Sequence, residues 1–150
     1  MSMRSFVVLL SFLSTACSGF QREWRGAVAA QPVPATNFTG VWSGTWHSES
    51  TGHSGKLRAI VTPAEGTTAG EPGSYDFHFH ATWAVILRGS YRTRFDVTEE
   101  QPGVFQVEGS HRLGRRGSYR QQGTLTKDQF DATYDAGFDH GTMVLRRPTR

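Results

Sequence analysis

The sequence of 150 residues is poor in cysteine, in charge and in long apolar runs. A single cysteine excludes an intramolecular disulfide and a multi-cysteine zinc site. Charged residues make up 19%, and the net charge of +3 is too small to indicate a nucleic-acid partner. The first apolar run, residues 6–13, is far shorter than the ~20 residues that span a bilayer. No cofactor is indicated by any motif.

Glycine is the residue type that stands out. There are 17 glycines and 6 prolines, whereas helical bundles rely on Ala, Leu, Glu and Lys. This composition favours short strands and tight turns. The length is that of a single domain, without a second unit.

The N-terminus has the pattern of a secretory signal peptide. Arg4 is the only charge in residues 1–18, and it precedes the short apolar run and the small residues Ser14-Thr15-Ala16. We therefore expect residues 1–16 to be removed on export.

Ser14-Thr15-Ala16-Cys17 resembles the bacterial lipobox. The resemblance implies that Cys17 becomes the acylated first residue of an exported lipoprotein. Such a protein is anchored in a bacterial membrane, on its periplasmic or cell-surface face. Two or three acyl chains would hold the chain on that membrane durably. The alternative is ordinary cleavage near Ala16, which leaves a free thiol.

Residues 17–36 follow as a linker rich in Ala, Pro and Gly. They show no sustained period of 2 or 3.6, so we expect a flexible tether that holds the domain off the membrane without packing on it.

From residue 37 onward, apolar and polar residues alternate in short bursts, which is typical of half-buried strands. Eight such segments are separated by turn residues such as Gln101-Pro102-Gly103. They are centred on residues 38–46, 57–61, 75–83, 91–97, 105–109, 119–125, 130–134 and 141–145.

The connections between these segments are mostly of hairpin length. We therefore predict an all-β domain over residues 37–150, an eight-stranded antiparallel up-and-down barrel in which closure removes both sheet edges. A β-sandwich is the structural alternative, although sandwiches usually need longer crossovers.

The first and last segments carry a family resemblance. Gly40-Val41-Trp42 in the first and Arg146-Arg147 at the end of the last resemble the calycin superfamily of lipocalins, fatty-acid-binding proteins and avidins. The resemblance implies that Gly40 and Trp42 belong to the closed floor of the barrel. Arg146 or Arg147 would lie across the indole; we assign Arg146 to the floor.

Two further patterns, Trp42-x-Gly44-x-Trp46 and Gly52-His53-x-Gly55-x-Leu57-Arg58, resemble small lipobox-bearing proteins of planctomycete-type bacteria. This likeness supports the reading of the chain as a bacterial lipoprotein, and it adds no activity.

The inward-facing rings of the predicted barrel either fill it or line a cavity, because eight strands enclose room for side chains or for one small ligand. If a ligand binds, the expected walls are Trp46, Phe77, Phe79, Tyr91, Phe95 and Tyr119.

His78 and His80 are the weak candidates for a metal site. Alternation places both on the same face of a strand, where a third histidine could complete a zinc-type site. However, Phe77 and Phe79 occupy the opposite face, so we expect these histidines on the solvent side in a structural role, with no metal.

The sequence thus predicts an exported, lipid-anchored, non-catalytic protein. It would bind a small apolar ligand or act as an interaction module of the envelope, with the membrane as its partner through Cys17. The alternative is a metal-dependent or hydrolytic enzyme centred on His78 and His80. No nucleophile–base pair or matched carboxylates support an enzyme.

Overall fold

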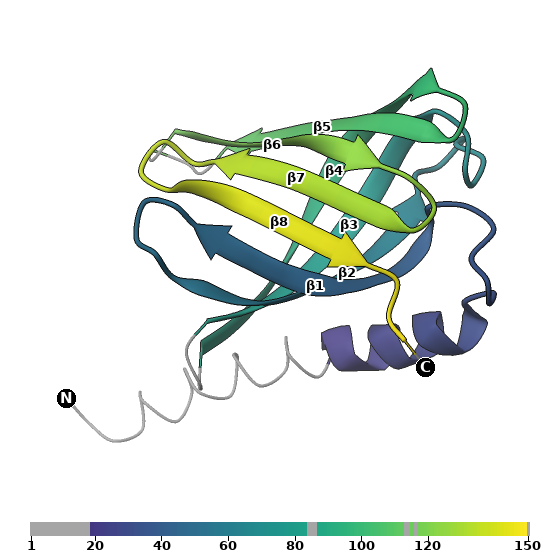
Figure 1. Ribbon diagram of the computed structural model, residues 1–150, viewed down its shortest axis with the longest axis horizontal. Coiled ribbons are helices and arrows are strands. Elements are labelled where there is room, and N and C mark those ends of the chain that lie inside the picture. Colours follow the sequence, from purple (N-terminus) through teal and green to yellow (C-terminus); the bar gives the residue numbers. More distant parts are fainter. Residues whose placement is uncertain (1–18, 84–86, 113–114, 116, 150) are drawn as a thin grey trace.

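The computed structural model describes residues 19–149 except 84–86, 113–114 and 116. Its strands form one closed antiparallel barrel in which each strand pairs with the next and the last pairs with the first (Figure 1). The strands are β1 (Gly40–Ser48), β2 (Ser54–Pro63), β3 (Gly73–Trp83), β4 (Leu87–Gln101), β5 (Val104–Arg112), β6 (Ser118–Leu125), β7 (Gln129–Asp135) and β8 (His140–Arg146). The predicted up-and-down barrel is confirmed, and the sandwich is not formed.

Alternation along each strand determines which side chains enter the barrel. In β7, Phe130, Ala132 and Tyr134 are buried, and in β8 Met143 and Leu145 are. The residues between them, Asp131, Thr133 and Val144, face outward. The predicted period of two therefore separates inside from outside correctly.

The two ends of the barrel differ, and we name them the floor and the mouth. The floor is the end where the chain enters β1 after Phe38 and leaves β8 at Arg147; the mouth is the end that carries the β1–β2 and β7–β8 turns.

The half of the barrel nearer the floor is filled with aromatic rings. Phe77, Phe95 and Phe130 pack with ring centroids 4.5 Å (Phe77–Phe95) and 5.6 Å (Phe77–Phe130) apart.

Residues 19–30 form a helix that lies along the outer wall of the barrel (Figure 1). Phe20, only 1% exposed, packs with Trp24, Ala27 and Val28 against Val41 and Ile60, two apolar residues on the outer face. The cation–π contact of Arg58 with Trp24, at 5.0 Å, adds to this packing.

This helix differs from the expected flexible tether over 17–36. Phe20, Trp24, Ala27 and Val28 are spaced i, i+4, i+7 and i+8, so one helix face is apolar and needs a partner. Residues 31–36 have no helix or strand, whereas the predicted signal peptide over residues 1–16 and Cys17 lie outside the described residues.

Candidate functional site

A pocket of about 530 Å³ lies at the mouth of the barrel. Its walls are mostly apolar and aromatic, which is the usual character of a site for a small organic molecule. The lining residues come from β1, β2, β3, β4, β6, β7 and β8 and from the β1–β2 and β7–β8 turns: Trp46, Thr51, His53, Leu57, Ala81, Tyr91, Tyr119, Tyr134, Ala136, Phe138, Asp139 and Met143.

Three of these residues are tyrosines whose rings pack against one another. The rings of Tyr91 and Tyr119 meet edge to face with centroids 6.3 Å apart, and Tyr119 and Tyr134 are 5.8 Å apart. Beside them, Gln121 on β6 donates from Nε2 to the hydroxyls of Tyr119 at 3.1 Å and Tyr91 at 3.4 Å. The pocket therefore combines apolar walls with a small group of hydroxyls.

The tyrosine hydroxyls stay protonated. Burial raises the pKa of Tyr91 and of Tyr119, and burial together with the Asp139 carboxylate raises the pKa of Tyr134 to about 12. Asp139 is already engaged, because its carboxylate accepts hydrogen bonds from Ser48 Oγ and, at 3.2 Å, from the Tyr134 hydroxyl. The pocket thus offers neutral hydroxyls, and Asp139, the one carboxylate among its described lining residues, already has partners.

Trp46 is fixed in the wall by its indole nitrogen, which donates to the Thr82 carbonyl at 3.0 Å. Gly55, the register partner of Trp46, makes this possible. A Cβ on residue 55 would lie 1.6 Å from the Thr82 oxygen and 2.8 Å from the Trp46 Nε1. A side chain here would force the indole and its acceptor apart.

The six predicted wall residues divide into two groups. Trp46, Tyr91 and Tyr119 do line the pocket. Phe77, Phe79 and Phe95 do not: they are completely buried, deeper in the barrel, and belong to its packed core. The interior is thus partly filled and partly open.

Sequence reasoning missed several pocket residues. Leu57, Ala81, Tyr134 and Met143 alternate inward on their strands, so the period-two pattern contained their signal. Phe138 lies in the β7–β8 turn and is 65% exposed, a large apolar side chain at the rim of the mouth. Its exposure was visible only in the structure.

The floor is closed by an aromatic–arginine contact. Trp42 is completely buried, and its Nε1 donates to the Phe38 carbonyl at 3.1 Å. The guanidinium of Arg147 lies 4.0 Å from the centre of the indole and donates to the carbonyls of Asn37, Val41 and Lys127. Burial lowers the pKa of Arg147 to about 10, so it remains charged at neutral pH.

The assignment of Arg146 to the floor is wrong in this structure. Leu145 points inward, so the next residue points outward, and Arg146 forms an exposed ion pair with Asp131 at 2.7 Å. Gly40 does lie at the floor. Its φ of +99° and the close approach of the Gln31 side chain, which accepts from the Val41 amide, both require a residue without Cβ.

His78 and His80 lie on the outer face as predicted, but they are buried beneath the N-terminal helix. His78 Nδ1 is 2.8 Å from the Glu23 carboxylate, and His80 Nδ1 is 2.8 Å from Ser90 Oγ. Phe20 packs on both rings. Within the described part of the chain no three His, Cys, Asp or Glu residues are grouped to hold a metal ion. Both histidine rings contact the N-terminal helix through Phe20, and His78 also contacts it through Glu23.

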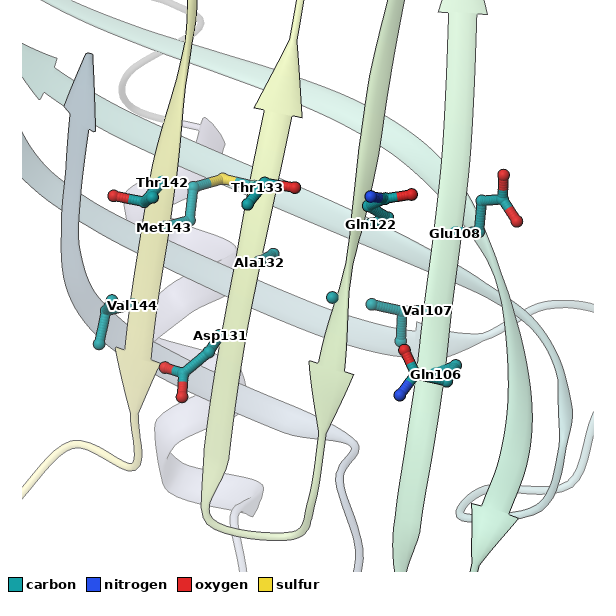
Figure 2. Close-up of a pocket in the computed structure, with 11 residues that line it drawn as sticks. Gln106, Val107, Glu108, Gln122, Asp131, Ala132, Thr133, Thr142, Met143 and Val144 are labelled. Carbon is teal, nitrogen blue, oxygen red and sulfur yellow. The ribbon is translucent and has the colours of Figure 1, made fainter. Parts of the chain in front are cut away.

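A second hollow lies on the outer wall over β5–β8 (Figure 2). Thr133, Thr142 and Val144 form part of it, and Figure 2 shows these short side chains standing on neighbouring strands. It has a volume of about 670 Å³ and no aromatic ring among its lining residues. The mouth pocket is therefore the stronger candidate site.

Comparisons with protein-family models, with curated proteins and with solved structures found no match. Among the described residues, no helix has the length and apolar character needed to cross a membrane.

Proposed function

We propose that this chain is a calycin-like binding protein that takes up a small apolar ligand through the mouth of its barrel. The observation that carries the proposal is the pocket of about 530 Å³ beside a core that is otherwise packed with rings. A rigid barrel that leaves room at one end is suited to holding one small molecule. No catalytic step is proposed.

The lining of the pocket indicates the character of the ligand. Trp46, Leu57, Ala81 and Met143 offer apolar surface, and no lysine or arginine is among the described residues that line it. Among these described residues, an anionic group would lose its hydration without gaining a lysine or arginine partner. The arrangement favours a mainly apolar and uncharged molecule.

We further propose that the protein is exported and anchored in a bacterial membrane through acylated Cys17. The lipobox-like residues 14–17 support this proposal. The described helix packs on the barrel through Phe20, and Cys17 precedes the first described residue by two positions in the sequence. At ~3.5 Å per residue, a barrel anchored in this way lies close to the lipid surface.

Ligand binding can be tested by titrating the full chain with a library of fatty alcohols, fatty acids and retinoids, using calorimetry and tryptophan fluorescence. We expect binding heat and a change in fluorescence. Because Trp46 lines the pocket, Trp46→Phe should reduce the fluorescence change and retain the heat. A library without any binding heat would overturn the proposed function.

A further inference from the structure

Gln121 is an unusual side chain for the interior of this barrel. It points inward from β6 and is 1% exposed. Its Nε2 donates to the hydroxyls of Tyr91 and Tyr119 and lies 3.6 Å from Met143 Sδ. Its Oε1 has no hydrogen-bond partner among the described residues.

A buried amide oxygen without a partner is costly, because it has lost its hydrogen bonds to water and gained none in return. An apolar side chain of similar size would fill the same space without that cost. The other inward residues of β6, β7 and β8 are small, apolar or aromatic, including Leu125, Ala132 and Leu145. The amide nitrogen serves the hydroxyls of Tyr91 and Tyr119, but neither packing nor these hydrogen bonds give a reason for the unpaired oxygen.

The amide lies directly behind the pocket. Tyr91, Tyr119 and Met143, which it contacts, all line the pocket. Nε2 already serves the two tyrosine hydroxyls, so Oε1 is the atom of this amide that lacks a partner. Exchanging the two atoms would need a half-turn about the terminal torsion of the side chain. A ligand that enters from the mouth can therefore complete the hydrogen bonding of this amide.

The partner group must match its surroundings. It must donate a proton to Oε1, and it lies among tyrosine hydroxyls that the high pKa values keep neutral. A hydroxyl both donates and accepts, so it fits an amide and two phenols at once. A carboxylate cannot donate a hydrogen bond to Oε1. An ammonium group would need an anionic partner, and the Asp139 carboxylate already accepts hydrogen bonds from Ser48 and Tyr134.

We propose that the ligand is an apolar molecule with a neutral hydroxyl, and that Gln121 recognises this hydroxyl at the inner end of the pocket. This inference rests on the proposed binding function. It adds the chemical class of the ligand and the residue that selects it.

Four probes with the same dodecyl chain test it by calorimetry on the full chain, the two neutral ones below their solubility limit and the two charged ones below their micelle concentration. They are dodecan-1-ol, its methyl ether, dodecanoate and dodecyltrimethylammonium. We expect the alcohol to bind about tenfold more tightly than the ether, because the ether cannot donate to the amide oxygen. The two charged probes should bind more weakly than the alcohol.

Gln121→Met removes the amide and keeps an unbranched side chain of similar length. We expect it to reduce the alcohol-over-ether preference to less than about threefold. Gln122→Met is the matched control, because Gln122 is the next residue on β6 and faces outward. This control should retain the preference.

Equal binding of alcohol and ether by the unmodified chain would overturn the inference and leave the proposed function standing. So would tightest binding of the carboxylate or the ammonium. Failure of all four probes would count against the proposed function itself. If Gln121→Met does not fold, the comparison of alcohol with ether on the unmodified chain still decides the question.

Discussion

The guanidinium of Arg147 covers the indole of Trp42 at 4.0 Å and at the same time donates to three backbone carbonyls. These carbonyls belong to Asn37, Val41 and Lys127. One side chain thus ties the segment before β1, the start of β1 and the β6–β7 turn to the C-terminal segment. The floor is closed by this single residue and the ring beneath it.

Arg147→Ala should lower the free energy of unfolding by about 3 kcal/mol, since it removes the cation–π contact and leaves carbonyls without their donor. Arg146→Ala should cost at most about 1 kcal/mol, because the pair with Asp131 is exposed. Urea unfolding of both variants checks this. Equal losses for the two arginines would contradict the assignment of the floor to Arg147.

Phe20→Ala should release the N-terminal helix while the barrel stays folded. The ring fills a buried site between the helix and the outer wall, so its removal should cost about 3 kcal/mol of docking energy. Hydrogen exchange should show loss of protection at residues 21–30, with the strand amides unchanged. Arg25→Ala, on the exposed side of the helix, is the control. Concerted loss of protection throughout the barrel would mean that helix and barrel unfold as one unit.

His80 should make the protein less stable below pH 6.5. Burial, followed by the charges of Arg58, Arg88 and His78, lowers the pKa of His80 in the folded state. As the pH falls through 6.5, the unfolded chain takes up a proton that the folded chain does not, so the stability present at higher pH is lost.

Urea unfolding at about pH 7.5 and about pH 5.5 measures this loss. His80→Gln should reduce the difference between the two pH values, whereas His47→Gln, at an exposed position, should retain it. An undiminished pH dependence in His80→Gln would show that other groups cause it.

Ala81→Phe should block ligand binding without unfolding the barrel. Ala81 lines the pocket, so a ring at this position would enter the open space in place of ligand. We expect affinity for dodecan-1-ol to fall at least about tenfold, with stability changed by at most about 1 kcal/mol. Thr133→Phe on the exposed outer wall is the control. Unchanged affinity in Ala81→Phe would place the ligand elsewhere.

The strands and their closure were predictable because the period of two runs through most of the sheet, and connections mostly of hairpin length leave few topologies. The same alternation also identifies Arg147, and not Arg146, as the arginine at the floor. Leu145 faces inward, so the side chain two residues later lies on the same side. The helix was missed because Phe20, Trp24 and Val28 are separated by charged and small residues. Their spacing becomes meaningful only once Val41 and Ile60 are known to offer an apolar outer wall.

The extent of the pocket was not predictable. Phe79 and Tyr91 are register partners and stack with centroids 5.1 Å apart, yet only Tyr91 lines the pocket. Which inward ring is packed and which borders open space depends on depth in the barrel, and alternation carries no such information. That Gln121 Oε1 has no hydrogen-bond partner among the described residues was likewise not predictable, because it depends on contacts between strands.

The measurement that tests the binding account most directly is a map of backbone amide chemical shifts during titration with dodecan-1-ol. The account predicts saturable changes around the mouth, at residues including Trp46, Leu57, Tyr119 and Gln121, with the floor around Trp42 unaffected. Absence of saturable changes, or changes confined to the outer hollow over β5–β8, would contradict it.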